Sequence, residues 1–166
     1  MIVMRLLSSL KHDESERGIF HLGRALVKGG HTSIIVSSAD DNNDLVKRLE
    51  RDGNLYHQLY MNKKSWISLL QIAPLRHLIE KYNPDVIHVH SRTPAWILHL
   101  ALRRAKVKRV PKLVSTMYGF YPINKYSQAL LDVDTIITVS DSVTNYLVKG
   151  IRREDLGHKH IKRIYR

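Results

Sequence analysis

A short apolar run that passes through polar residues into a helical pattern is the feature of this sequence that most constrains its fold. The run is Val86–Val89, residues 90–93 are polar, and Pro94 precedes a helical pattern of apolar residues over 96–105. Proline is favoured in the first turn of a helix, so the sequence predicts a buried strand that leads directly into a helix. Junctions of this kind lie at the carboxyl edge of open α/β sheets, where ligands bind.

The same alternation of strand-like and helical patterns extends along the whole chain. Apolar runs with β-branched residues predict strands at 2–7, 33–37, 55–59, 86–89, 113–116 and 135–139, and a basic edge strand at 161–166. Helical spacing predicts helices at 20–27, 45–49, 66–82, 95–105, 124–131 and 141–148, and the third is expected to kink or restart at Pro74. We therefore predict an α/β fold, a Rossmann-like three-layer domain whose mainly parallel twisted sheet is flanked by helices.

At 166 residues the chain has the length of one domain, so we expect residues 1–166 to form a single unit. It contains no cysteine, which excludes a disulfide framework and a thiolate metal site. No apolar stretch reaches the roughly 18–20 residues of a membrane-spanning helix. These features fit a cytoplasmic protein that meets a membrane, if at all, peripherally at the inner face of the cytoplasmic membrane.

The chain is strongly basic, with 27 Lys and Arg residues against 15 Asp and Glu and a formal net charge of +12. This charge predicts attraction to polyanions such as nucleic acid, acidic lipid or phosphorylated substrates. Two clusters stand out, one over residues 152–166 and one that we take as a candidate surface for anions, formed by Arg103, Arg104, Lys106, Lys108 and Arg109. A solvated helix end followed by a loop explains each cluster equally well. A specific nucleic-acid partner is not expected, because aromatic residues do not interleave with the clusters.

Two histidines mark the end of the 86–89 run. His88 and His90 are two residues apart on a strand, so their side chains share one face of the sheet. Such a pair can chelate zinc, but no third ligand is evident nearby, and we predict no metal site. His90, at the strand end, is the better candidate for contact with a ligand, whereas His88 is expected in the core, bonded to a neighbouring loop. Ser91 and Arg92 then either bind an anion at the helix start or form an ordinary helix cap.

Two further loops follow predicted strands. Residues 8–18 occupy the position of a phosphate-binding turn, but Gly18 is their only glycine, so the dinucleotide fingerprint is absent. The carboxylates of this loop would repel a phosphate, so it is predicted to be a capped helix start. After the strand at 113–116, Tyr118 and Phe120 flank Gly119. These aromatics either form a stacking platform for a sugar or base, or pack over the end of the sheet.

Four segments match a known family in their order and spacing. They are residues 16–31, which begin Glu-Arg-Gly and end Gly-Gly-His, 84–91 (Pro-Asp-Val-Ile-His-Val-His-Ser), 114–119 (Val-Ser-Thr-Met-Tyr-Gly) and 136–142 (Ile-Ile-Thr-Val-Ser-Asp-Ser). On these segments the chain resembles the N-terminal domain of family 4 (group 1) glycosyltransferases, which have the GT-B fold of two facing Rossmann-like domains. Residues 92–96 are similar to a bacterial subgroup associated with lipopolysaccharide or capsule assembly.

The resemblance implies transfer of a sugar, of the retaining hexosyl type, from a nucleotide-sugar donor to a glycan or lipid-linked acceptor in cell-envelope polysaccharide synthesis. No metal or other cofactor is implied. It implies that this domain carries the acceptor side and that a C-terminal domain outside this chain binds the donor. No catalytic residue is assigned, and His90 and Tyr118 are the best candidates. The implied substrate-binding residues are Ser15, Glu16, Arg17, Gly18, His90, Ser91, Arg92, Tyr118 and Gly119.

Two positions depart from the family's pattern. Residues 13–15 stand where the family has two adjacent glycines, and Tyr118 replaces the histidine of a Thr-x-His-Gly segment. Because the donor-binding domain lies outside the chain, we expect residues 1–166 alone to be inactive. Two other functions stay open: a non-catalytic interaction subunit of a split glycosyltransferase and, less favoured, a basic α/β domain that binds nucleic acid.

Overall fold

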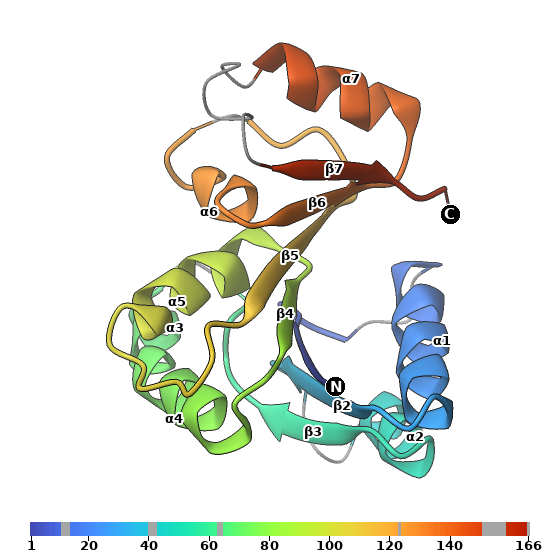
Figure 1. The fold of residues 1–166 in the computed structure, drawn as a ribbon, viewed down its shortest axis with the longest axis vertical. Coiled ribbons are helices and arrows are strands. Elements are labelled where there is room, and N and C mark those ends of the chain that lie inside the picture. Colours follow the sequence, from blue (N-terminus) through green and yellow to red (C-terminus); the bar gives the residue numbers. More distant parts are fainter. Residues whose placement is uncertain (11–13, 40–42, 63–64, 123, 151–158, 166) are drawn as a thin grey trace.

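Seven parallel strands form one sheet in the order β3-β2-β1-β4-β5-β6-β7 (Figure 1). The computed structural model describes residues 1–10, 14–39, 43–62, 65–122, 124–150 and 159–165. The strands are β1 (Ile2–Leu6), β2 (Thr32–Ser37), β3 (Leu55–Gln58), β4 (Val86–Val89), β5 (Lys112–Met117), β6 (Thr135–Thr138) and β7 (His160–Arg163). The strands expected at 2–7, 33–37, 55–59, 86–89, 113–116 and 135–139 are all present.

Helices cover both faces of this sheet (Figure 1). They are α1 (Glu14–Lys28), α2 (Asp44–Arg51), α3 (Trp66–Leu70), α4 (Ile72–Tyr82), α5 (Arg92–Leu102), α6 (Gln128–Leu131) and α7 (Asp141–Gly150). Apolar residues of α1 and α2 form a core with Leu7 and Ile35 on one face. Those of α4, α5 and α6 form a larger core with β1, β2 and β4 on the other face, and α7 packs on β6. The expected three-layer α/β architecture is confirmed.

The central strands alternate between these two cores. Met4 and Leu6 of β1 enter the larger core, together with Ile87 and Val89 of β4. The intervening residues point to the α1 side, since side chains alternate along a strand. The register pairs Arg5 with His88, which places Arg5, His88 and His90 on one face. The polar residues of the central strands therefore gather on the α1 side of the sheet.

Several helix boundaries differ from the expected ones. The helix expected over 66–82 is two helices that meet at Gln71, and Pro74 is the third residue of α4 rather than the break. Proline fits there because a backbone N–H in the first turn has no partner within its own helix. The helix expected over 124–131 is confined to Gln128–Leu131, because Asn124 instead caps the turn before it through bonds from Tyr126 N and Ser127 N.

The ends of the chain also refine the sequence prediction. Helix α1 begins at Glu14, so residues 15–17, which we expected in a loop, lie in the first turn of a helix. The basic edge strand is confirmed as β7, although it is shorter than the range 161–166 and begins one residue earlier.

Within the described ranges, no helix is both long enough and apolar enough to cross a membrane.

Candidate functional site

The carboxyl ends of β4 and β5 bring two of the expected site residues into contact. The Nδ1 atom of His90 lies 2.6 Å from the hydroxyl of Tyr118. The two rings are stacked, with centroids 6.0 Å apart and planes inclined by 21°. His90 is buried and Tyr118 is half-buried. Because β4 and β5 are neighbours in the parallel sheet, this pair lies at the edge where open α/β sheets bind ligands.

His88 continues this polar group into the sheet. Its Nε2 atom lies 2.8 Å from Thr116 Oγ1, and its ring centroid lies 4.1 Å from that of His90. The expectation that His88 is a core histidine is confirmed, but its partner lies on the adjacent strand β5 and not on a loop. Across the described parts of the chain, no group of three or more histidine or carboxylate side chains is placed to hold a metal ion.

The start of α5 carries Arg92 between two tyrosines. The guanidinium carbon lies 5.1 Å from the ring centroid of Tyr121 and 5.3 Å from that of Tyr126. The hydroxyl of Tyr126 is in turn hydrogen-bonded to Thr93 Oγ1. Burial raises the pKa of Tyr121, and the nearby charge of Arg92 opposes that rise. Arg92 is thus held in place by aromatic faces at the carboxyl edge, close to the backbone N–H groups of the first turn of α5.

Ser91 occupies the N-cap position of α5 but does not act as an ordinary cap. Its backbone is extended, with φ −158° and ψ 163°, and its side chain makes no capping hydrogen bond. The Oγ atom is buried and has no hydrogen-bond partner in the described part of the chain. A buried hydroxyl without a partner is costly, so this atom is a candidate for contact with a ligand or an ordered water.

The two aromatic residues that flank Gly119 differ in their surroundings. Tyr118 packs over the end of the sheet against His90, whereas the ring of Phe120 is exposed. Phe120 meets Tyr146 edge to face, with centroids 5.2 Å apart, and the Tyr146 hydroxyl donates to the backbone carbonyl of Tyr121. A Cβ added at Gly119 would meet no atom within 4 Å, so the described structure gives no steric reason for glycine there.

Sequence reasoning missed Arg5, which is fully buried beside this group. Its Nη1 donates to the carbonyl of Ile19 at 2.6 Å, and its Nη2 donates to Ser33 Oγ and Asn54 Oδ1 at 3.2 and 3.3 Å. Burial lowers the pKa of Arg5 to about 10, and an electrostatic interaction with Tyr118 opposes this shift. The signal in the sequence was a single arginine inside the apolar run 2–7, which is unusual for a central strand.

Gly23 explains how α1 lies so close to Arg5. A Cβ at this position would stand 2.5 Å from Asn54 Oδ1 and 2.6 Å from Arg5 Nη2. Both distances are below any normal contact, so the position accepts no side chain without movement of the buried bonds. Gly23 therefore fixes the approach of α1 to the polar face of the sheet.

The remaining expected site residues lie at the start of α1. Ser15, Glu16, Arg17 and Gly18 belong to the first turns of this helix, which follows the carboxyl end of β1. The side chains of residues 15–17 are outside the described part of the structure. The structure thus brings His90, Ser91, Arg92, Tyr118 and Gly119 to one edge and places the α1 N-terminus at the same edge by topology.

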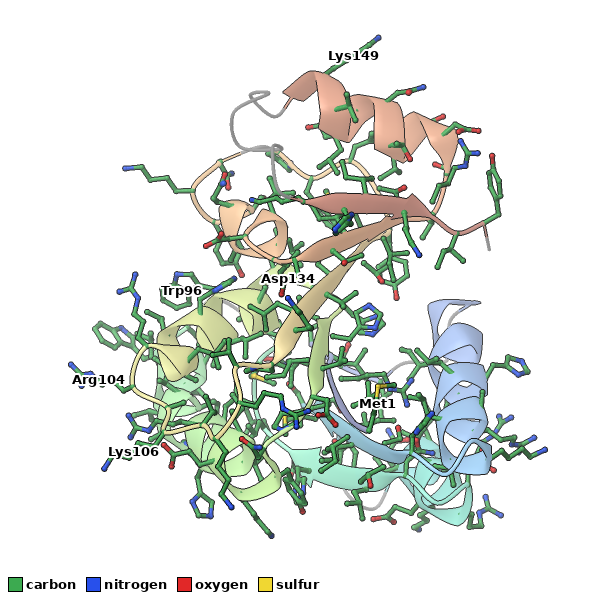
Figure 2. All side chains as sticks on the ribbon, viewed as in Figure 1. Met1, Trp96, Arg104, Lys106, Asp134 and Lys149 are labelled. Atoms are coloured by element: carbon green, nitrogen blue, oxygen red, sulfur yellow. The ribbon has the colours of Figure 1, made fainter. Side chains whose placement is uncertain are left out.

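The basic cluster lies at the other end of α5. Arg103, Arg104 and Lys106 are exposed, and Figure 2 shows Arg104 and Lys106 directed away from the body of the molecule. Arg109 is paired with Asp85 at 2.6 Å, so part of the cluster is neutralised. The cluster is therefore separate from the carboxyl-edge group and presents its charge to solvent.

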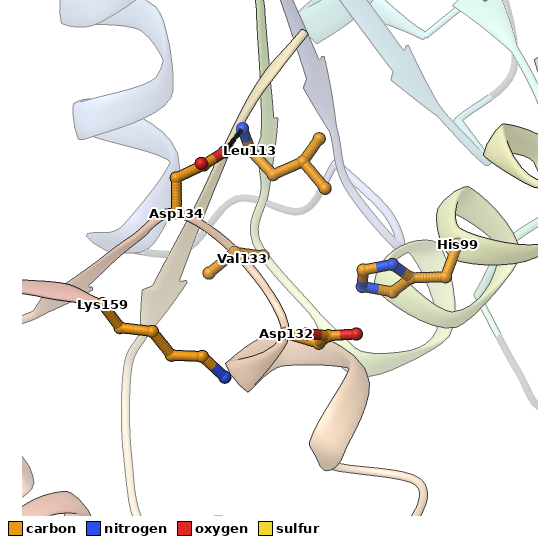
Figure 3. Close-up of a pocket in the computed structure, with 6 residues that line it drawn as sticks. All are labelled: His99, Leu113, Asp132, Val133, Asp134 and Lys159. Carbon is orange, nitrogen blue, oxygen red and sulfur yellow. Dashed lines mark hydrogen bonds between the residues drawn. The ribbon is translucent and has the colours of Figure 1, made fainter. Parts of the chain in front are cut away.

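A surface hollow of about 410 Å³ lies near the amino edge of the sheet, the edge at which α5 ends (Figure 3). Its wall includes Leu113 near the start of β5, Asp134 before β6 and Lys159 before β7. The backbone N–H of Leu113 donates to Asp134 Oδ2 at 2.8 Å. This hollow lies at the edge opposite His90 and Tyr118, so it is not part of the candidate site.

Solved structures share this fold over almost the whole chain. A glycosyltransferase from Rickettsia africae ESF-5 is 27% identical with a TM-score of 0.76, covering 99% of this chain and 42% of that one. The lipopolysaccharide outer core galactosyltransferase WaaB is 12% identical with a TM-score of 0.71, covering 99% and 45%. HepE from Anabaena, solved with UDP and glucose, is 17% identical with a TM-score of 0.67, covering 99% and 44%. No curated protein matches the sequence significantly.

The chain thus spans less than half the length of these three structures. A model of the family described as Glycosyltransferase Family 4 matches residues 15–158, which is most of the sequence. The match includes the strands and helices that hold the carboxyl-edge group, from the first turn of α1 to the end of α7. By this match the chain belongs to glycosyltransferase family 4.

Proposed function

We propose that this chain is the acceptor-side domain of a glycosyltransferase that moves a sugar from a nucleotide-sugar donor to a glycan or lipid-linked acceptor in cell-envelope polysaccharide synthesis. The observation that carries the proposal is the pair of His90 and Tyr118 at the carboxyl edge. The Nδ1 atom of His90 lies 2.6 Å from the hydroxyl of Tyr118. A sugar presents several hydroxyl groups that both donate and accept, and imidazole and phenol groups at a sheet edge match that chemistry.

Transfer of a sugar requires the nucleotide diphosphate to leave while positive charge develops at the anomeric carbon. The protein must hold the acceptor hydroxyl within bonding reach of that carbon and stabilise the departing phosphates. In our proposal, His90, Ser91 and Tyr118 orient sugar hydroxyls, and Arg92 with the α5 N–H groups contributes positive charge near the phosphates. The remaining contacts to the nucleotide sugar come from a second domain, which is the donor side of the proposed enzyme.

Three finer points belong to the same proposal. Transfer proceeds with retention at a hexosyl centre, and residues 1–166 alone turn over no substrate, because one domain supplies only half of the cleft. The nucleotide sugar is a substrate, and no further cofactor takes part. The structure of HepE holds UDP and glucose, which supports a nucleoside diphosphate sugar as the donor class here.

The proposed cell-envelope role draws on the exposed basic segment. Arg103, Arg104, Lys106 and Lys108 are exposed, and their charge would attract an anionic membrane surface or a phosphorylated glycan. In this proposal the protein works at the inner face of the cytoplasmic membrane. The similarity to WaaB, named as a lipopolysaccharide outer core galactosyltransferase, is consistent with that setting.

The test measures glycan binding by saturation-transfer NMR with a panel of envelope oligosaccharides. Tyr118→Phe removes the hydroxyl that meets His90 and is expected to weaken binding by about tenfold, the value of one good hydrogen bond. Tyr82→Phe is the matched control, because Tyr82 pairs with His57 Nε2 at 2.9 Å elsewhere in the fold. Absence of binding by any glycan, or equal binding by the two variants, would overturn the proposal and favour an interaction subunit.

A further inference from the structure

Phe120 is an exposed aromatic residue in the loop that follows β5. Its side chain is 62% exposed, whereas the residues on either side of it, Gly119 and Tyr121, are half-buried. The loop begins at the carboxyl end of β5, so Phe120 lies at the same edge of the sheet as the pair of His90 and Tyr118. The contacts proposed for the sugar hydroxyls give this ring no role.

The loop is anchored on both sides of Phe120. On one side, the hydroxyl of Tyr118 lies 2.6 Å from His90 Nδ1. On the other side, the ring of Tyr121 packs against two of the apolar cores, and its backbone carbonyl accepts from the Tyr146 hydroxyl at 2.9 Å. Because both neighbours are held in place, the exposure of Phe120 is a property of the folded loop.

Phe120 keeps an open ring face in this position. Its ring meets that of Tyr146 on α7 with a centroid distance of 5.2 Å and an angle of 84° between the ring planes. In an edge-to-face contact one ring presents only its edge, so Tyr146 leaves at least one face of Phe120 uncovered. The same contact fixes the orientation of the ring. Phe120 is therefore a flat apolar surface that is ordered before any ligand binds.

Gly119 leaves space beside this surface. A Cβ added at Gly119 would meet no described atom within 4 Å, and the φ of this residue is not positive. Neither packing within the described structure nor backbone conformation therefore requires a glycine here. A glycine lets a ligand approach the backbone closely. Along the chain, this open position stands between the polar pair of Tyr118 with His90 and the open ring of Phe120.

A pyranose ring matches this arrangement. Its C–H bonds form apolar faces, whereas its hydroxyl groups lie around the rim and pair with imidazole and phenol groups. A protein partner buries about 800 Å² on each side, more than a single exposed ring offers. A stacked base of a nucleic acid needs a basic groove for the adjoining phosphates, and residues 118–122 include no lysine or arginine. The chemistry of the loop therefore favours a sugar.

We propose that Phe120 is a stacking platform for a pyranose ring of the acceptor, and that Gly119 keeps the position beside it open. This inference deepens the proposed function, on which it rests, by naming a sugar subsite and the residue that selects for a ring there. A pyranose ring is present both in the acceptor and in the sugar of the donor, so the experiment separates these two sources.

Fluorine NMR with 4-fluorophenylalanine reads the platform directly, because the chain contains two phenylalanines. Phe20 is only 6% exposed and serves as the internal control. Phe120→Leu assigns the two signals by removing one of them. We expect methyl β-D-glucopyranoside or methyl β-D-galactopyranoside to shift the signal of Phe120 and to leave that of Phe20 unchanged. A Phe120 signal that neither glycoside shifts would overturn the proposal.

Substitutions then test the platform and the open space separately. Phe120→Ala is expected to weaken glycoside binding, measured by saturation-transfer NMR, by about tenfold, the value of one stacking contact. Phe120→Trp keeps an aromatic face and should retain binding. Gly119→Val fills the open space and should abolish binding without a change in thermal unfolding. Val110→Ala is the matched control, because Val110 is 81% exposed before β5, at the amino edge. Full binding by Phe120→Ala would contradict the proposal.

Nucleotide probes and Tyr118→Phe separate the other outcomes. UDP-glucose that shifts the Phe120 signal at a lower concentration than the glycosides would assign the ring to the donor, and a shift caused by uridine would assign it to a base. Either result overturns the acceptor subsite. Loss of glycoside binding in Tyr118→Phe but not in Phe120→Ala refutes only this inference. Loss in Phe120→Ala but not in Tyr118→Phe refutes the sugar-binding role proposed for Tyr118 and leaves Phe120 as the platform.

Discussion

The guanidinium of Arg5 on β1 donates to the backbone carbonyl of Ile19 on α1 at 2.6 Å. This bond joins the central strand of the sheet to the helix that covers its polar face, and it lies in a fully buried position. The same side chain interacts electrostatically with Tyr118 at the carboxyl edge. A single buried cation therefore links the packing of α1 to the candidate site.

The first prediction concerns the pH dependence that follows from Arg5. Burial lowers its pKa from the ordinary value of an arginine to about 10, so between these two values the unfolded chain binds more protons than the folded one. The free energy of unfolding therefore rises with pH between these two pKa values. At lower pH the buried guanidinium is charged, and its burial lowers the free energy of unfolding. We expect the stability of the wild type relative to Arg5→Met to increase from about pH 9 to about pH 11, by about 1 kcal/mol. Urea denaturation of both proteins measures this difference, and a constant difference would show that Arg5 is not desolvated.

The second prediction concerns Gly23. Alanine is the better helix former, by about 1 kcal/mol, but its Cβ would collide with Asn54 and Arg5 at 2.5 and 2.6 Å. We expect Gly23→Ala to lower the free energy of unfolding by about 1–3 kcal/mol, the range for overpacked positions. Gly119→Ala is the control, because its Cβ meets no atom within 4 Å. Equal stability of the two variants in thermal unfolding would show that α1 moves aside freely.

The architecture followed from the sequence because each apolar run is short, β-branched and bounded by turn residues, as at Val86–Val89. The pairing of His90 with Tyr118 could be predicted from the sequence only in part. Both residues follow predicted strands, but the distance between their side chains depends on the register of these strands in the sheet. The role of Arg5 could not be predicted from the sequence, because its hydrogen-bond partners Ser33 and Asn54 are distant along the chain. The exposure of Trp66 and Leu70 could not be predicted either, because the sequence predicted one amphipathic helix over 66–82, whereas the structure divides it at Gln71.

The third prediction concerns the buried pair of His88 and Thr116. Thr116→Val keeps the shape of the side chain but removes the hydroxyl that lies 2.8 Å from His88 Nε2. We expect a loss of about 1–3 kcal/mol of stability, because a buried ring nitrogen loses this partner. Thr32→Val, at an exposed position on β2, is the control and should change stability little. Chemical denaturation near neutral pH measures both, and a stable Thr116→Val protein would mean that His88 finds another partner.

The last prediction separates the two roles considered for Ser91. An ordinary N-cap serine contributes about 1 kcal/mol to stability, and its replacement by alanine removes that contribution. Ser91 Oγ makes no capping bond and is buried without a partner in the described part of the chain, so Ser91→Ala should leave stability unchanged or slightly raise it. Asn43 is the matched comparison, because its side chain does cap α2, accepting from Leu45 N at 2.9 Å, and Asn43→Ala should lower stability by about 1 kcal/mol. In our proposal Ser91 also orients a sugar hydroxyl, so Ser91→Ala should at the same time weaken glycan binding. A destabilised Ser91→Ala protein with full glycan affinity would instead make Ser91 a structural residue and remove it from the site.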